Sequence, residues 1–311
     1  MPTRASLAGN PGRAALPALV LAIAIAAAGC HPGNDEAKRL IANCDGGDVT
    51  ACHTLGRKLL KGEYILRDET RAAGVFGQAC DGGVAEGCAQ LGILNQSGRG
   101  VPRDSARALE LFRQGCEAGS MEGCTHLAIR YRLGAGVDED IPRAAELFQQ
   151  ACDSLQVTAC SNLGELYANG EGVTRDPARA APLFERACDG KVLDACVGLG
   201  RLLVAGDGVD QDEARAAGLF EKGCDGRVPA GCFELGNLHA AGLGVTQNLQ
   251  RAAELYEIAC DRRIGEACFV LATLYREGTG VTADPGRAAA LTRRACSLEY
   301  QPACPPKKRR A

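Results

Sequence analysis

The sequence predicts an all-α protein, a solenoid (superhelix) of αα-hairpins built from seven 36-residue repeats. The first observation behind this prediction is a pair of cysteines, C-x7-C, that returns every 36 residues from Cys44 to Cys304. The second is a helix–turn–helix pattern of apolar, small and glycine residues between successive pairs. The third is the composition, with 4% aromatic residues, no tryptophan and 40 glycines. This period is typical of stacked repeats, which contact only their neighbours and need no single central core.

The first 29 residues are predicted to be a signal peptide and are excluded from the fold. They contain two arginines and a short apolar stretch, residues 16–29, that ends in small residues. The ending AAGC at residues 27–30 resembles the lipobox of bacterial lipoproteins, in which the cysteine, here Cys30, is lipidated. The alternative is an ordinary secretory signal followed by a chance cysteine. We expect an exported protein of the bacterial cell envelope, and His31 in place of an aspartate after Cys30 favours the outer membrane.

The mature chain is then predicted to have three parts. Residues 30–51 hold the anchor and a capping helix, expected over Asp35–Cys44. Residues 52–304 hold the solenoid, with seven hairpins and a terminal half unit. The basic tail, residues 305–311, is expected to be a solvated, disordered end, with contact to an anionic surface as the alternative.

Each repeat is predicted to form two helices, and residues 160–188 show why. The first helix places Leu163 and its small and apolar neighbours on one face, and Gly170 ends it, because glycine readily adopts the left-handed conformation. Asp176 stands at the N-cap of the second helix, and a proline follows at the first helical position. Pro182 inside the second helix predicts a kink that the other copies lack.

An arginine recurs three residues after the N-cap of each second helix. A row of arginines suggests an anionic ligand, but an Asp-x-x-Arg pair at a helix start explains the row better, through local electrostatics and packing of the side-chain stem. The row consists of Arg71, Arg107, Arg143, Arg179, Arg215, Arg251 and Arg287.

Sixteen of the 17 cysteines occupy repeat positions, and Cys30 is the odd one. The pairs are Cys44 and Cys52, Cys80 and Cys88, Cys116 and Cys124, Cys152 and Cys160, Cys188 and Cys196, Cys224 and Cys232, Cys260 and Cys268, and Cys296 and Cys304. Pairing within C-x7-C uses all sixteen, whereas pairing across each hairpin leaves Cys44 and Cys304 free. We therefore expect inter-repeat disulfides, as in an oxidising compartment. Structural zinc usually takes cysteines two to four residues apart, so a metal site is disfavoured.

The repeat unit L-G-x-L-Y-x-x-G-x-G-V-x-x-D-x-x-x-A-A-x-L-F resembles the Sel-one-like repeat, a relative of the tetratricopeptide repeat. The C-x7-C spacing makes it similar to the cysteine-rich secreted bacterial subfamily. In the first repeat, Glu63-Tyr64 replaces the second loop glycine and Lys58 replaces an apolar residue, as a more exposed terminal unit would tolerate. The resemblance implies an αα superhelix that acts as a scaffold or adaptor for other proteins. It also implies, as an alternative, weak binding or hydrolysis of β-lactams.

No residue pattern in the sequence carries that hydrolytic chemistry. The S-x-x-K, S-D-N, K-T-G and G-x-S-x-G patterns are absent, and the four histidines are widely spread. A net charge of −3 gives a nucleic-acid partner no electrostatic support. We expect no catalytic residue, metal or cofactor, and a protein or peptide partner. A peptidoglycan-like or β-lactam ligand is the further alternative.

Variable positions after each second cysteine give a candidate ligand face. Val197, Phe233 and Phe269, with Val270 beside the last, are predicted to form an apolar strip on the first helices. An exposed strip of this kind suits a peptide or a partner helix. The competing interpretation, equally well founded, is that these side chains cover the seam between adjacent hairpins.

Overall fold

The structure is a computed structural model that describes residues 32–304. Within that range it is all-α, with 15 α-helices and a terminal 3-10 helix, η1 (Gln301–Ala303). The helices are α2 (Pro32–Asp45), α3 (Val49–Lys61), α4 (Glu69–Asp81), α5 (Ala85–Ser97), α6 (Ser105–Glu117), α7 (Met121–Leu133), α8 (Ile141–Asp153), α9 (Val157–Asn169), α10 (Pro177–Asp189), α11 (Leu193–Ala205), α12 (Glu213–Asp225), α13 (Pro229–Ala241), α14 (Leu249–Asp261), α15 (Gly265–Glu277) and α16 (Pro285–Ser297). The predicted fold class is therefore confirmed.

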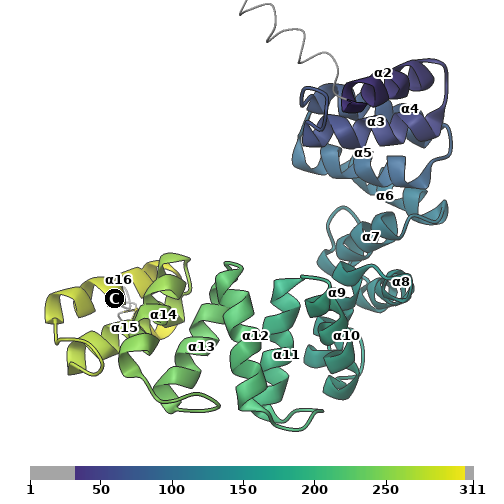
Figure 1. Ribbon diagram of the computed structural model, residues 1–311. Helices are drawn as coiled ribbons and strands as arrows, with labels where there is room; N and C mark the ends of the chain where they lie inside the picture. Colours follow the sequence, from purple (N-terminus) through teal and green to yellow (C-terminus); the bar gives the residue numbers. More distant parts are fainter. Residues whose placement is uncertain (1–31, 305–311) are drawn as a thin grey trace, which may run out of the picture. The chain divides into compact units, whose positions relative to one another are not determined.

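The chain divides into two compact units, Met1–Asp104 and Ser105–Ala311. In the N-terminal unit, α2 packs on α3, α3 on α4 and α4 on α5 (Figure 1). In the C-terminal unit, each helix from α6 to α16 packs on the next, and η1 packs on α16. The lone capping helix predicted over residues 35–44 is α2, which begins at Pro32.

Local chemistry fixes where the helices begin and end. Asp176 is the N-cap of α10, and its carboxylate accepts a hydrogen bond from the backbone N–H of Arg179. Gly170 ends α9 with φ of 74°, a left-handed conformation that costs glycine little. Helix α10 runs through Pro182 and has 13 residues, like its counterparts, so the proline does not interrupt it.

Glycine also sets the spacing between the two helices of a hairpin. A Cβ atom on Gly56, Gly200 or Gly236 would lie 2.5–2.8 Å from an aromatic ring of the following helix, namely Phe76, Phe220 or Tyr256. These rings are 0–2% exposed. The small residue after each leucine of the first helix is therefore required by packing, because a larger side chain would push the two backbones apart.

All eight predicted disulfides are present between residues 44 and 304, with Cα–Cα distances of 4.4–4.8 Å. The Cys188–Cys196 bridge, for example, joins the end of α10 to the first turn of α11. By the chain-entropy estimate, closing such a short loop stabilises the native state by about 2–3 kcal/mol. The number of disulfides indicates an oxidising, extracytoplasmic compartment.

Candidate functional site

The predicted apolar strip is not a continuous exposed surface. Val197 is only 3% exposed, so the prediction of an exposed side chain is wrong for this residue. It lies against α12, where a Cβ atom on Gly223 would come within 2.8 Å of Val197 Cγ2. Val197 is buried because the two helices of its own hairpin, α11 and α12, approach closely at this glycine.

The other three strip residues are half-buried. The Phe233 ring lies 5.8 Å from the Tyr256 ring, and the Phe269 ring lies 5.5 Å from the Tyr300 ring, both in tilted arrangements. Aromatic pairs at this distance stabilise the fold. Both contacts lie within one hairpin, between α13 and α14 for Phe233 and between α15 and the segment after α16 for Phe269. The two phenylalanines therefore pack inside their own hairpins and do not cover the seam between adjacent hairpins. Val270 follows Phe269 on α15.

A hollow of about 440 Å³ nevertheless opens on the first helices α9, α11 and α13 of the C-terminal unit. Phe184, Val197 and Leu202 line its inner part, and each of them is buried. The small side chains of Ala168 and Ala205 line it as well. The strip prediction therefore found one residue of the hollow, Val197, for the wrong reason.

The hollow exists because α11 carries a glycine where the flanking helices carry longer side chains. Gly198 occupies the position that Asn162 holds in α9 and Glu234 holds in α13. A Cβ atom on Gly198 would lie 3.0–3.1 Å from three carbon atoms of the Phe184 ring, so the ring lies directly beneath this glycine. The flanking side chains are fixed, because Asn162 donates a hydrogen bond to the Thr158 carbonyl oxygen and Glu234 accepts one from Arg201.

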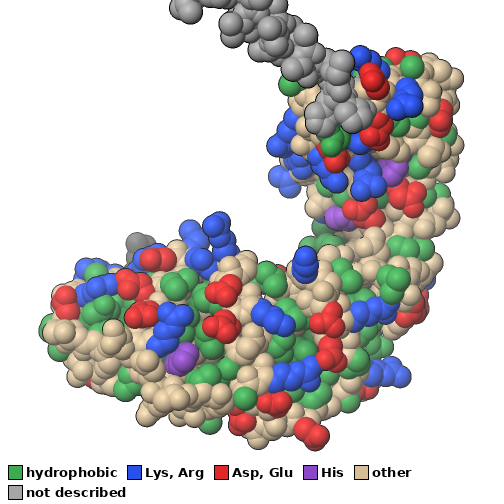
Figure 2. Space-filling model, in the orientation of Figure 1, with side chains coloured by type: hydrophobic (Ala, Val, Ile, Leu, Met, Phe, Trp, Pro, Cys, Tyr) green, Lys and Arg blue, Asp and Glu red, His purple; other side chains and the backbone are tan. Residues whose placement is uncertain are grey.

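Charged side chains surround this apolar interior, and most of them are paired. Glu165 accepts a 2.8 Å hydrogen bond from Arg132, and Arg175 forms an ion pair with Asp207. Arg201 contacts Glu234 at 2.8 Å. Asp194, in the first turn of α11, has no hydrogen-bond or ion-pair partner among the residues that the structure describes. Figure 2 shows acidic and basic side chains interspersed with hydrophobic ones over helices α10 to α13.

A second hollow, of about 300 Å³, lies between α11 and α13, and Arg201 lines both hollows. Its lining includes Asn237, whose amide oxygen accepts a 2.8 Å hydrogen bond from the Tyr256 hydroxyl. Burial, with the nearby charge of Glu234, raises the pKa of Tyr256 to about 12. The phenol therefore remains a neutral donor and holds the Asn237 amide in place.

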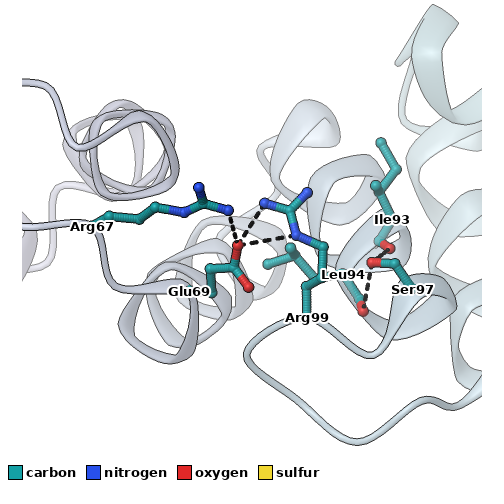
Figure 3. Close-up of polar contacts among 6 residues, drawn as sticks. All are labelled: Arg67, Glu69, Ile93, Leu94, Ser97 and Arg99. Carbon is teal, nitrogen blue, oxygen red and sulfur yellow. Dashed lines mark hydrogen bonds and ion pairs between the residues drawn. The ribbon is translucent and has the colours of Figure 1, made fainter.

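The N-terminal unit carries a different cluster, at the start of α4 (Figure 3). Glu69 accepts hydrogen bonds from Arg67 at 2.5 Å and from Arg99 at 2.7 and 3.1 Å. The hydrogen bonds from Arg99 and Arg67 lower the pKa of Glu69 to about 2. Ser97 beside them donates to the Ile93 carbonyl oxygen, within its own helix. The cluster ties the first turn of α4 to the loop after α5.

The arginine row has a structural role, which extends beyond the pairs that the sequence suggested. The capping carboxylates accept hydrogen bonds from the backbone N–H of the arginines, as Asp212 does from Arg215. Guanidinium groups of the row also reach the preceding hairpin: Arg215 pairs with Glu185, and Arg287 pairs with Glu257 in the same way. Arg179, by contrast, pairs with its own cap, Asp176, at 3.5 Å.

Between residues 32 and 304, no group of three or more His, Cys, Asp or Glu side chains is placed to hold a metal ion. No helix in the same range is long and apolar enough to span a membrane. Cys30, the predicted lipidation site, and the basic tail 305–311 lie outside the described residues.

The family follows from a match to the Sel1 repeat. The repeat matches seven times, over residues 49–84, 85–120, 122–154, 157–192, 193–227, 229–263 and 265–300. The chain belongs to the Sel1-repeat family. With these repeat boundaries, six of the eight disulfides join one Sel1 repeat to the next. The first disulfide joins Cys44, before the first repeat, to that repeat, and the last joins the seventh repeat to Cys304, which follows it.

Two solved structures have the same fold, and a third is similar in sequence over part of the chain. The antigen c5321 of uropathogenic Escherichia coli has a TM-score of 0.69 and 24% identity over 86% of this chain, which spans 57% of the antigen's length. A Sel1 repeat protein from Oxalobacter formigenes has a TM-score of 0.66 and 23% identity, covering 78% of this chain and 98% of its own. Helicobacter pylori cysteine rich protein B is 27% identical over 42% of this chain and 93% of its own, with a TM-score of 0.34. A comparison with curated proteins found no significant match.

Sequence reasoning missed Gly198, the residue that opens the hollow. Its signal was present, because the same position of the repeat carries a side chain in each of the other six copies. The predicted ligand face was based on apolar side chains, chiefly the phenylalanines of the later hairpins, and a glycine contributes no side chain to such a pattern.

Proposed function

We propose that this Sel1-repeat protein is an extracytoplasmic scaffold that binds a polypeptide partner along the first helices α9, α11 and α13. The observation that carries the proposal is the hollow beneath Gly198, with its apolar interior and charged rim. Apolar depressions with a few placed polar groups are the usual form of binding sites on proteins. A partner segment that fills the hollow buries apolar surface, and the rim charges set its orientation.

The surroundings of the hollow support this use. The adjoining second hollow extends the surface along α13, and Leu243 on its edge is 43% exposed. Both hollows lie on the first helices, whose outward residues differ from copy to copy while the core residues repeat. A rigid scaffold with a variable face suits recognition of a specific partner, because the scaffold fixes the relative positions of the variable side chains.

Site-specific photocrosslinking tests the proposal. A photoreactive phenylalanine analogue at Ala168 or Ala205, both in the hollow, is expected to crosslink a protein partner in cells that make this chain. The matched control carries the analogue at Glu221, an exposed position on the second helix α12. Equal yields at both faces, or crosslinks from Glu221 alone, contradict the proposal.

A lipid anchor at Cys30 belongs to the same proposal. The AAGC sequence at residues 27–30 supports it, and His31 favours attachment to the outer membrane. Mass spectrometry of the purified protein tests it: a diacylglyceryl modification on an N-terminal Cys30 is expected. A mature N-terminus elsewhere, with an unmodified thiol at Cys30, contradicts it. The β-lactam alternative rests on the family resemblance alone, and a turnover assay with a chromogenic cephalosporin decides it.

A further inference from the structure

The hollow beneath Gly198 has a shape and charge that select one kind of side chain. Resting on the proposed binding of a polypeptide at this face, we propose that the hollow anchors a lysine or arginine side chain of the partner. The aliphatic stem lies on the apolar interior, and the cationic head reaches the carboxylate of Asp194.

The interior fits the stem. Phe184, Val197 and Leu202 offer apolar atoms, and the alanines of α9 and α11 leave room for an unbranched chain. Lysine and arginine bury their methylene groups against such surfaces while the charged head stays near water. A volume of about 440 Å³ accommodates one such side chain together with part of its backbone.

The rim fits the head. Glu165 and Asp207, the other two carboxylates that line the hollow, are already paired with arginines. Asp194 has no such partner within the described range, and it lines the same hollow. An incoming cation therefore gains a carboxylate without breaking an existing ion pair. A carboxylate in the first turn of α11 also stabilises that helix, so any test must separate helix stability from binding.

The charge of the whole unit favours the same partner. Residues 105–304 contain 28 Asp and Glu against 20 Lys and Arg, and the tail 305–311 adds 4 basic residues, so the whole unit has a net charge of −4. Residues 32–104 contain 10 Asp and Glu against 9 Lys and Arg, a net charge of −1. An acidic unit attracts basic polypeptides at long range and speeds their encounter at low salt.

The probe is a phage-displayed library of random dodecapeptides, selected against the full chain. Selected peptides are expected to share one basic residue, and replacing it by norleucine, which keeps the stem and removes the charge, should weaken binding. Asp194→Asn is expected to weaken binding by about five-fold at physiological salt, as for a partly exposed charge pair. Glu266→Gln is the matched control: it removes a carboxylate from the equivalent position of α15, outside the hollow, and should leave the affinity unchanged.

A second variant tests the hollow itself. Ala205 is exposed, so Ala205→Leu fills the hollow without overpacking the core, and about a ten-fold loss of affinity is expected. Ala241→Leu, the equivalent change in the second hollow, should have little effect. Circular dichroism melts of all four variants separate loss of binding from loss of folding.

The outcomes distinguish this inference from the proposed function. Selected peptides that lack a basic residue, or that bind Asp194→Asn as tightly as the parent chain, overturn the lysine or arginine anchor and leave peptide binding intact. A library that yields no peptide with a Kd below about 1 mM overturns the proposed peptide-binding function, and the anchor with it.

Discussion

The two units share one hairpin plan but differ in what their first helices present. In the N-terminal unit, the first helix α3 carries Arg57, Lys58 and Lys61. In the C-terminal unit, the corresponding helices carry the two hollows and a rim in which carboxylates outnumber arginines. The buried positions do not show this difference, because both units bury leucines, alanines and aromatic rings at equivalent positions of the repeat. The surface of the first helices therefore varies while the core and the disulfides stay fixed.

The shared core gives the largest expected effect. Phe76 in the N-terminal unit and Phe220 in the C-terminal unit are 0% and 1% exposed, and each packs on a glycine of the preceding helix. Phe76→Ala and Phe220→Ala should each lower the free energy of unfolding of the surrounding hairpins by about 3–5 kcal/mol. Hydrogen exchange of α3 and α11 measures the two losses separately. Losses that differ by more than two-fold would show that the two units do not share a core plan.

The half-buried phenylalanines come next. Phe233→Ser and Phe269→Ser should each cost about 2 kcal/mol of stability, because each ring loses an aromatic contact and buried area. The equivalent residue of the N-terminal unit is His53, whose ring lies 5.9 Å from the Phe76 ring, and His53→Ser should cost less. Urea unfolding followed by circular dichroism measures all three. If the variant with both Phe233→Ser and Phe269→Ser is as stable as the parent chain, the two phenylalanines do not stabilise the fold and are again candidates for ligand binding.

Acid should weaken the C-terminal unit through His126. Its ring stacks on Phe112 with centroids 4.8 Å apart, whereas the equivalent residue of α3 is Thr54. Burial, and secondarily the charge of Arg130, lowers the pKa of His126 to about 4. Because the unfolded chain binds this proton more readily, stability is lost as the pH falls from about 6.5 to about 4, by about 2 kcal/mol after allowing for partial exposure.

The variant His126→Asn, which copies the residue of α9, should remove this part of the pH dependence. Urea unfolding at pH 7, 5.5 and 4.5 provides the comparison. Parallel pH profiles for the variant and the parent chain would show that His126 is protonated equally in the folded and unfolded states.

The smallest effect is expected at the Glu69 cluster of the N-terminal unit. Its pKa is lowered to about 2 in the folded chain, so the carboxylate contributes stability above the unfolded pKa of about 4.5. That contribution is lost as the pH falls through about 2. Glu69→Gln should make the melting temperature depend less on pH between pH 5 and pH 2. The difference in melting temperature between the variant and the parent chain should be smaller in 1 M NaCl, because the carboxylate is accessible to solvent and salt screens its charge. A difference that persists unchanged at high salt would point to a buried pair instead.

Much of this architecture could be predicted because each repeat follows the same local rules. The period, the disulfide pairing, the N-caps and the glycine ends all follow from residues whose roles depend on near neighbours. Tyr64, in the first repeat, replaces the second loop glycine, and the sequence predicted that an exposed terminal repeat would tolerate this change. Tyr64 adopts φ of 60° and is 49% exposed. In the interior, a Cβ atom on the equivalent Gly208 would lie 2.3 Å from the Ala178 nitrogen, so glycine is needed there.

The binding surface could not be predicted in the same way. Whether Val197 is exposed depends on how closely α12 approaches α11, and that distance is set by Gly223, 26 residues away in the sequence. The hollow depends on the absence of a side chain at Gly198 and on the Phe184 ring beneath it, which comes from the preceding hairpin. Both are relations between different helices, and the pattern of residues within one helix does not contain them.

The short span of each disulfide has a consequence for biogenesis. Cys52 lies 8 residues from Cys44 but 28 from Cys80, and the same intervals recur along the chain. In the unfolded chain, loop-closure entropy favours the shorter loop by about 1 kcal/mol. During N-to-C emergence into an oxidising compartment, each cysteine of this set also meets its native partner before the next pair has emerged. The chain can therefore oxidise in order of synthesis, one bridge at a time, with little need for an isomerase to correct mispaired cysteines.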